Sequence, residues 1–167
     1  MGVIFDLDQT LINSNVAREY RNARQWGKVY DLVNRMTVFD GIMDVLQILR
    51  QNNVKIAIVT SSPRSYCEKI VNYFDISADV IVCYHDTFFH KPNPEPIFKA
   101  VELLNEEPKY IYSVGDEEKD IVASNRAGVV SCYAKWGVIG DEITSEKSNF
   151  EFNSVGEMER FFNRLFC

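Results

Sequence analysis

Two aspartates, Asp6 and Asp8, directly follow the short apolar run Val3-Ile4-Phe5. At positions i and i+2 on a chain that leaves a strand, both side chains can face one pocket. Two carboxylates this close do not both stay charged cheaply unless a cation lies between them or one is protonated. A structural turn explains an isolated Asp-x-Asp pair equally well, so the pair indicates a site only if other polar residues join it.

Such residues follow three further apolar runs of the chain. They are Thr60 with Ser61, then Lys91, and then Asp116 with Asp120. Ligands of open α/β sheets bind at the carboxyl ends of the strands, so we expect these side chains to meet Asp6 and Asp8 at one rim. Carboxylate oxygens suit Mg²⁺, which commonly takes one or two carboxylates, waters and a substrate phosphate. We therefore predict a bound Mg²⁺, which ligand type alone does not distinguish from Mn²⁺, with Lys91 offsetting part of the remaining charge.

Five short apolar runs predict the strands that end at this rim, namely residues 3–5, 55–59, 80–83, 110–114 and 129–133. The runs are β-branched, aromatic and continuous, which is typical of strands buried on both faces of a parallel sheet. The segments between them have helical patterns, and strands that alternate with helices indicate βαβ units. We predict a single α/β domain over residues 1–167. It is an open, mostly parallel, Rossmann-like sheet of about five strands with helices on both faces.

Helix starts are predicted at residues whose side chains can accept a hydrogen bond from the first turn. Gly128 is predicted to follow the end of one helix. The predicted N-caps are Asp40, Ser62, Asn93, Asp116 and Ser154, and Pro63 and Pro94 are each predicted to be the first helical residue.

Residues 13–39 do not fit a simple crossover, since they are polar, helical in character, too long for a tight loop and too short for a domain. We expect a small helical insertion over the strand ends. It holds five basic and two acidic residues, whereas the whole chain has a net charge of −6. A basic insertion on an acidic body could steer anionic substrates. Its arginines at positions 18, 21 and 24 either form a solvated helix face or contact substrate, and both interpretations stay open.

The residues at the rim resemble the four motifs of the haloacid dehalogenase-like (HAD) hydrolase superfamily in order and spacing. Those residues are Asp6-Leu7-Asp8-Gln9-Thr10, Thr60, Lys91 and Gly115-Asp116-Glu117-Glu118-Lys119-Asp120. The flanks at 60–63, 91–98, 127–129 and 136–137 are similar to the phosphoglycolate phosphatase-like branch. The resemblance covers nearly the whole chain.

This resemblance implies a HAD-like fold and a phosphoric monoester hydrolase. Asp6 would be the nucleophile that forms an aspartyl-phosphate, and Asp8 the general acid and base. Thr60 and Ser61 would bind the phosphoryl oxygens, and Lys91 would neutralise charge. In this family the segment that corresponds to residues 13–39 is called the cap. Arg18 and Arg21 in this cap would be candidate substrate contacts. Mg²⁺ would be held by Asp6, the backbone carbonyl of Asp8 and Asp116, with support from Asp120.

Three details of the sequence refine these expectations within the superfamily. An acid at position 8 points to phosphatase or phosphomutase chemistry rather than dehalogenation. The cap is much shorter than the usual four-helix cap, so we expect a more open site, which disfavours a mutase that must exclude water. Gln9 stands where the family usually has Gly, and its Cβ predicts a backbone that avoids positive φ.

Composition indicates which binding partners and which alternative functions to expect for this chain. No apolar run approaches the roughly 18 residues of a membrane helix, and no secretory signal is present, so we expect no membrane contact. Four scattered cysteines indicate reduced thiols and a cytoplasmic protein. A net acidic chain is a poor nucleic-acid binder. We expect a monomer or homodimer that acts on a small phosphorylated metabolite. A macromolecular substrate, such as a nucleic-acid end or a phosphoprotein, is the alternative, and a non-catalytic binding protein is disfavoured because Asp6, Asp8, Lys91 and Asp116 are all present.

Overall fold

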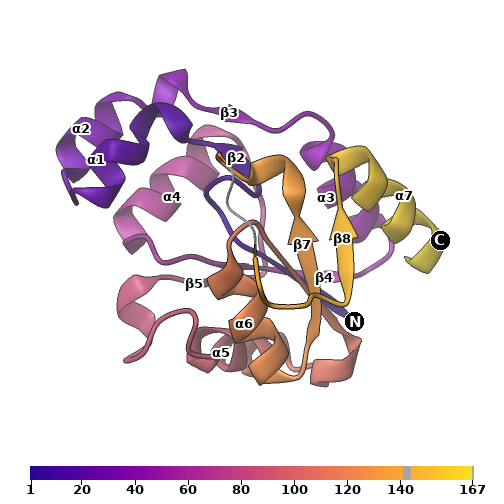
Figure 1. Cartoon of the computed structure of the whole chain (residues 1–167). Coiled ribbons are helices and arrows are strands. Elements are labelled where there is room, and N and C mark those ends of the chain that lie inside the picture. Colours follow the sequence, from indigo (N-terminus) through magenta and orange to yellow (C-terminus); the bar gives the residue numbers. More distant parts are fainter. Residues whose placement is uncertain (141–143, 167) are drawn as a thin grey trace.

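A six-stranded parallel sheet forms the centre of the molecule (Figure 1). The computed structural model describes residues 1–140 and 144–166. The strand order is β5-β4-β1-β6-β7-β8, and every neighbouring pair is parallel. The strands are β1 (Gly2–Phe5), β4 (Lys55–Val59), β5 (Val80–Val82), β6 (Ile111–Gly115), β7 (Val130–Ala134) and β8 (Phe150–Phe152). The predicted open parallel α/β sheet is therefore confirmed, and each of the five predicted runs forms a strand.

The sixth strand, β8, was not predicted from the sequence. It pairs with β7 at the edge of the sheet, where Cys132 lies opposite Phe150. Only Phe152 of its three residues is buried. A run of three residues with one buried side chain is too short to give a periodic signal.

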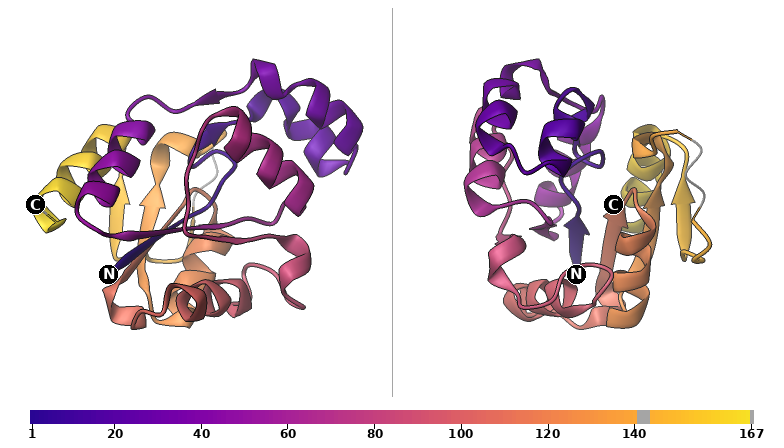
Figure 2. Two further views of the ribbon diagram at one scale, coloured as in Figure 1. Left: turned by 180° about the vertical axis from the view of Figure 1, so that it is seen from behind. Right: turned by 60° about the vertical axis from the view of Figure 1, so that its left-hand side comes forward.

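Helices cover both faces of the sheet (Figures 1 and 2). The helices α3 (Ile42–Gln51), α4 (Arg64–Tyr73) and α7 (Val155–Phe166) pack on one face, and α5 (Glu95–Leu104) and α6 (Glu118–Ala127) on the other. Val3 and Phe5 of β1 belong to the first core and Ile4 to the second. Because successive strand residues point to opposite faces, a strand covered on both sides favours apolar residues at every position, as in β1.

Several helices begin one residue later than the sequence predicted. The residues that directly precede α3, α4, α5 and α6 are Gly41, Pro63, Pro94 and Glu117, not Asp40, Ser62, Asn93 and Asp116. For Ser62 and Asp116 the reason is that their side chains bond with other partners at the rim, Asp8 and Thr10 respectively. Before α3, Gly41 has a φ of +88°, a conformation that glycine adopts at no steric cost.

Gly128 and Ser154 take the helix-end positions that the sequence predicted, and Asn93 bonds with its helix from a different position. Gly128 follows α6 with a φ of +73°. Asn93 accepts a hydrogen bond from the N–H of Glu95 at 3.0 Å, so it bonds with the first turn of α5 from one residue further out than predicted. Ser154 Oγ accepts one from the N–H of Glu157 at 3.3 Å.

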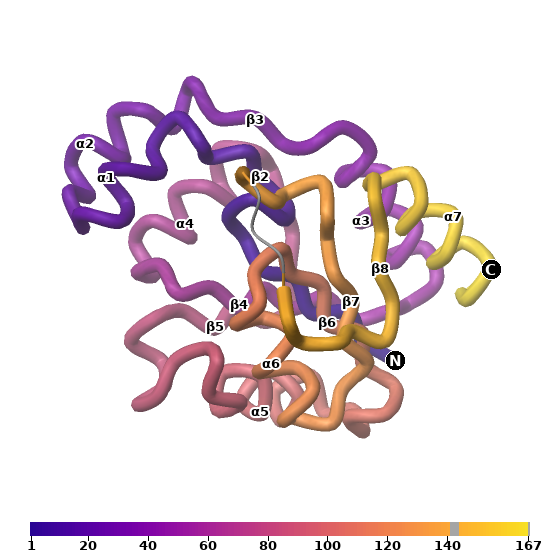
Figure 3. Tube along the Cα trace, viewed as in Figure 1, coloured from indigo at the N-terminus to yellow at the C-terminus, as the bar shows by residue number. Residues whose placement is uncertain are grey.

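The predicted insertion, residues 13–39, is attached through a short antiparallel pair, β2 (Ile12–Asn13) with β3 (Thr37–Val38). Between these strands lie two short helices, α1 (Arg18–Asn22) and α2 (Trp26–Asp31). They stand beside α4 at the end of the sheet where the strands terminate (Figures 1 and 3). Side-chain contacts join α2 to α4, among them that of Lys69 Nζ, 5.8 Å from the centre of the Tyr30 ring. The Tyr30 hydroxyl lies 2.7 Å from Ser65 Oγ, and the Trp26 ring lies 5.5 Å from the Tyr66 ring.

Cys67, Cys83 and Cys132 are buried and unpaired, as predicted for reduced thiols, and Cys167 lies outside the described residues. Among the helices that the structure describes, none combines the length and the apolar character required to cross a membrane.

Candidate active site

A tight turn after β1 carries both predicted catalytic aspartates. The N–H of Asp6 donates to the carbonyl of Val114 at 2.9 Å, which extends the β1–β6 pairing by one residue. The N–H of Leu11 then donates to the carbonyl of Leu7 at 3.0 Å and closes the turn. Asp6 and Asp8 therefore stand at the carboxyl end of the strand that lies between β4 and β6, where the chain switches from one half of the sheet to the other.

The conformation of Gln9 contradicts the expectation from its Cβ, since its φ is +64°. A left-handed conformation costs a residue with a Cβ roughly 1–2 kcal/mol. Two hydrogen bonds offset that cost: the N–H of Gln9 donates to the Ile12 carbonyl at 2.7 Å, and Gln9 Oε1 accepts from the N–H of Ser14 at 2.8 Å. The hydrogen bond of the Gln9 side chain thus stabilises a backbone conformation that Gly, the usual residue here, adopts without steric cost.

The loop after β7 supports the same turn from the other side. The Trp136 indole N–H donates to the carbonyl of Thr10 at 3.1 Å. A Cβ on Gly137 would stand only 1.8 Å from the backbone oxygen of Gln9, so the backbones approach more closely than any other residue allows. The Trp136-Gly137 pair therefore fixes the position of the turn.

Three carboxylates converge at the rim, those of Asp6, Asp116 and Asp120, with oxygens that all lie within 4.8 Å of one another. Lys91 Nζ lies 2.7 Å from Asp6 Oδ1 and 2.6 Å from Asp120 Oδ1, and the side chain of Lys91 is only 3% exposed. Thr10 Oγ1 donates to Asp116 Oδ1 at 2.9 Å. Lys91 thus pairs with two members of a cluster in which Asp116 and Asp120 are buried and Asp6 is half-buried.

Burial, together with the neighbouring acids, raises the pKa of two members of the cluster. Burial raises the pKa of Asp6 to about 7, although the charge of Lys91 acts in the opposite direction. Burial, with the charges of Asp6 and Asp120, raises the pKa of Asp116 to about 9. Burial alone would lower the pKa of Lys91, but the charges of Asp120 and Asp6 raise it, so this lysine stays charged. Three carboxylates whose oxygens lie this close together are a donor set suited to a divalent cation.

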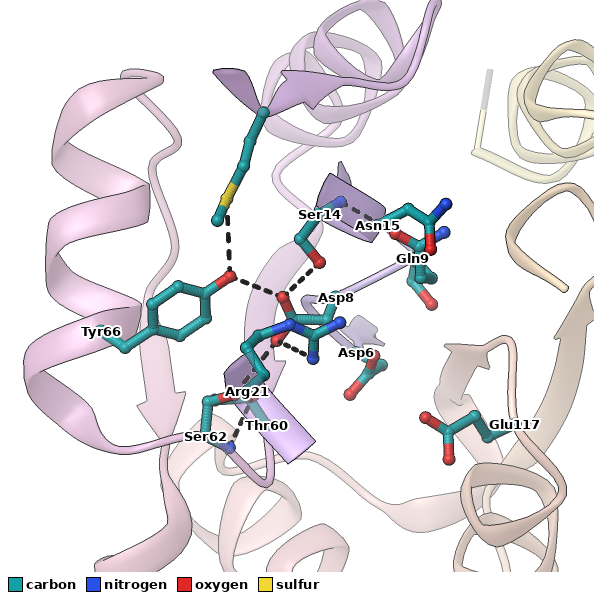
Figure 4. Close-up of polar contacts among 12 residues, drawn as sticks. Asp6, Asp8, Gln9, Ser14, Asn15, Arg21, Thr60, Ser62, Tyr66 and Glu117 are labelled. Atoms are coloured by element: carbon teal, nitrogen blue, oxygen red, sulfur yellow. Dashed lines mark hydrogen bonds and ion pairs between the residues drawn. The ribbon is translucent and has the colours of Figure 1, made fainter. Parts of the chain in front are cut away.

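Of the four predicted metal ligands, the structure brings together the side chains of Asp6, Asp116 and Asp120. The Asp8 carboxylate has different partners (Figure 4). Its Oδ1 accepts hydrogen bonds from the Tyr66 hydroxyl and from Ser14 Oγ, both at 2.7 Å. Its Oδ2 accepts one from Ser62 Oγ at 3.1 Å and lies 3.4 Å from Arg21 Nη1. Only the backbone carbonyl of Asp8 is left for the metal role that the sequence suggested.

The sequence did not identify Ser14 and Tyr66 as residues of the site. A buried aromatic side chain inside a helix gives the same pattern as any core residue, so Tyr66 carried no distinguishing signal. Ser62 was predicted as a helix cap, and its bond to Asp8 depends on the packing of α4 beside the turn after β1.

A cavity of about 270 Å³ lies over Asp6 and Asp8. Its walls include Thr60 and Ser61, as predicted, and Thr60 Oγ1 accepts a hydrogen bond from the N–H of Ser62 at 3.1 Å. Glu117 contributes from the start of α6, and its carboxylate points toward Asp6 (Figure 4). Four residues of the insertion line the cavity as well, namely Arg21, Asn22, Arg24 and Trp26.

The insertion covers part of this cavity, despite its small size. The Arg24 guanidinium lies 5.8 Å from the ring centre of Tyr84, a residue of the body on the same cavity wall. Arg21 has a side chain only 15% exposed and pairs with Asp8, so a purely solvated helix face is wrong for this arginine. Arg18 is half-buried and lines a second, smaller opening beside Asp8 and Asp116.

The parallel sheet and the acidic rim define the class of protein: the chain belongs to the haloacid dehalogenase-like hydrolase family, whose model matches residues 17–134. It is 34% identical over 130 residues to the pyrophosphatase PpaX of Bacillus mycoides, which covers 76% of this chain and 60% of that protein. It is 31% identical over 121 residues to the phosphoglycolate phosphatase of Aquifex aeolicus, with 71% and 55% covered. The matches thus span little more than half the length of these relatives.

Similarity to solved structures supports the fold. A hydrolase from Pseudomonas syringae superposes with a TM-score of 0.82 at 16% identity, over 100% of both chains. A HAD phosphatase from Thermococcus onnurineus gives a TM-score of 0.74 at 18% identity, over 96% of both chains.

Proposed function

We propose that this protein is a metal-dependent phosphatase that hydrolyses the phosphate monoester of a small metabolite through an aspartyl-phosphate on Asp6. The observation that carries the proposal is the difference between the surroundings of Asp6 and Asp8. Asp6 pairs with Lys91 at 2.7 Å and belongs to the cluster of three carboxylates, whereas the Asp8 carboxylate stands outside that cluster. One carboxylate is equipped to attack and the other to transfer protons.

In the first step a carboxylate oxygen of Asp6 attacks phosphorus, and the bond from phosphorus to the ester oxygen breaks. Asp8 gives that oxygen a proton, so the alcohol leaves neutral. In the second step Asp8 takes a proton from a water whose oxygen attacks phosphorus, and Asp6 is released. Lys91 neutralises charge beside Asp6 throughout, which is the main requirement of phosphoryl transfer.

Mg²⁺ is the proposed metal, held by Asp6, Asp116 and the Asp8 carbonyl with Asp120 in support. The convergence of the Asp6, Asp116 and Asp120 oxygens within 4.8 Å of one another supports a cation at this place, because three carboxylates so close together need positive charge between them. When bound, the cation would neutralise charge on the phosphoryl oxygens. Thr60 and Ser61, on the wall next to Asp6, are the proposed contacts of those oxygens, with Arg18 and Arg21 as proposed contacts from the insertion.

A small substrate fits this cavity better than a macromolecular one. The volume is about 270 Å³, and residues of the insertion and the body line it together, including Arg24 and Tyr84. The relatives named for pyrophosphate and phosphoglycolate point to compact anionic substrates. Arg21 and Arg24 on the wall are suited to such an anion.

The test is phosphate release from 4-nitrophenyl phosphate and a panel of phosphate esters, with Mg²⁺ and with a chelator. We expect release by the wild type that stops with the chelator and falls at least about 1,000-fold in Asp6→Asn. Asp44→Asn, an exposed aspartate on α3, is the matched control and should keep full activity. Undiminished release by Asp6→Asn would contradict the proposal.

A further inference from the structure

The side chain of Tyr66 contacts the proposed proton-transfer group but not the cavity. Tyr66 lies in α4, is 0% exposed, and its hydroxyl donates to Asp8 Oδ1 at 2.7 Å. Burial, then the charge of Asp8, raises the pKa of this phenol well above its usual value, so the hydroxyl keeps its proton and remains a donor. It does not line the cavity over Asp6 and Asp8.

The two oxygens of Asp8 differ in their surroundings. Oδ1 has two donors, Tyr66 and Ser14, both fully buried. Oδ2 faces Ser62 and Arg21, and both of these residues line the cavity. The oxygen that can reach a substrate is therefore Oδ2, while Oδ1 is fixed from behind.

The insertion holds the phenol in place. The Trp26 ring packs against the Tyr66 ring at 5.5 Å, and Met36 Sδ lies 3.8 Å from the hydroxyl. The single phenolic hydrogen goes to Asp8, because a bond of 2.7 Å to a carboxylate is far stronger than a contact of 3.8 Å to a thioether. Tyr66 thus connects the packing of the insertion with the orientation of Asp8.

We propose that Tyr66 is a positioning residue that holds Oδ1 of Asp8, so that Oδ2 delivers the proton to the leaving oxygen of the substrate. This inference rests on the proposed function. In the step concerned, the Asp6–phosphorus bond forms, the bond from phosphorus to the leaving oxygen breaks, and the proton moves from Oδ2 to that oxygen. A leaving group that is stable as an anion needs little of this help, whereas an alkoxide needs it most.

The test compares two substrates of different leaving-group ability in Tyr66→Phe, which removes only the hydroxyl. For an alkyl monophosphate we expect kcat to fall about 30-fold, and for 2,4-dinitrophenyl phosphate by less than about threefold, with KM little changed for either. Tyr30→Phe is the matched control, because it removes another tyrosine hydroxyl between the insertion and α4 without touching Asp8. It should leave both rates near the wild-type values.

An equal fall for both esters in Tyr66→Phe, or no fall for either, would overturn the proposal. Should Tyr66→Phe fail to fold, Ser14→Ala removes the other donor to Oδ1 and must give the same preference for the activated ester, and an equal effect on both esters would again overturn it. Failure of the wild type on both esters would instead contradict the proposed function itself. The two kinds of failure are thus distinguishable.

Discussion

Asp6 and Asp8 leave the same strand two residues apart, but their carboxylates have opposite surroundings. Asp6 lies among charges, with Asp116 and Asp120 within 4.8 Å and Lys91 at 2.7 Å. Asp8 lies mainly among neutral hydroxyl donors. One turn of the backbone brings both carboxylates to the same end of the sheet, and the side chains packed around each carboxylate then determine its chemistry. Asp6 is left short of positive charge, whereas the hydrogen bonds of Asp8 are satisfied without a metal.

Among the changes to the charged surroundings of Asp6, the replacement of Lys91 should have the largest effect on stability. Lys91→Met leaves Asp6 and Asp120 buried without their cation, which should lower the free energy of unfolding by about 3–5 kcal/mol. Urea denaturation in chelator measures it. Lys55→Met is the control, because Lys55 is 43% exposed and pairs with Glu106 at the surface, where less than about 1 kcal/mol is expected. Similar losses in both variants would show that Lys91 is not the centre of the cluster.

A substitution of Gly137 tests the turn that carries Asp6 and Asp8, because this glycine packs against the turn. In Gly137→Ala the new Cβ would collide with the backbone oxygen of Gln9, so the free energy of unfolding should fall by about 1–3 kcal/mol and phosphate release should fall with it. Gly156→Ala in α7 has space for its Cβ and should be neutral or stabilising by up to about 1 kcal/mol. Equal stability of both variants would refute the close approach.

The pH dependence of the metal-free protein sharpens the comparison further. The pKa values of Asp6 and Asp116 are raised on folding, from 3.8 to about 7 and about 9. Their contribution to stability is therefore complete below the ordinary value and is lost as pH rises through the folded values. The melting temperature in chelator should fall by about 4 °C or more between about pH 6 and about pH 9.

Two controls accompany that measurement. Mg²⁺ should restore more stability at the higher pH, because it replaces protons that the carboxylates have already lost. Asp116→Asn should flatten the pH dependence. A melting temperature that rises over this interval in chelator would contradict the charged environment of Asp6.

The smallest effect is expected from the insertion. Arg24→Ala removes a charge from the cavity wall and its contact with Tyr84, while the partners of Asp6 and Asp8 are untouched. KM for phosphate esters should rise about threefold to tenfold with kcat unchanged, as initial rates would show. Lys28→Ala removes a basic residue of the same insertion that does not line this cavity, so it should leave KM unchanged. An unchanged KM in Arg24→Ala would remove this arginine from substrate binding.

Much of this rim could be predicted from the sequence, because the ends of parallel strands meet whatever the intervening helices are. Asp6, Thr60 and Asp116 each follow a continuous apolar run, and the runs became neighbouring strands. The partners of Asp8 could not be predicted in the same way. Tyr66 reads as an ordinary core residue. The spacing of Arg18, Arg21 and Arg24 does not tell which of them turns inward, because that depends on how the insertion packs against α4.

Local backbone detail was also beyond the sequence pattern. The positive φ of Gln9 depends on a side-chain bond to Ser14 that no spacing rule anticipates. The short edge strand β8 depends on pairing with β7 rather than on its own three residues.

The proposed roles of Asp6 as nucleophile and Asp8 as general acid and base are tested most directly by trapping the aspartyl-phosphate intermediate. Asp8→Asn, mixed with 2,4-dinitrophenyl phosphate and Mg²⁺ and quenched in acid, should gain the mass of one phosphoryl group on the peptide that contains Asp6. Attack by Asp6 does not need an acid when the leaving group is this good, but release of the phosphoryl group needs the base that has been removed. The double variant Asp6→Asn/Asp8→Asn should gain nothing. A phosphoryl group found on another residue, or phosphate release by Asp8→Asn at the wild-type rate without any adduct, would contradict the account.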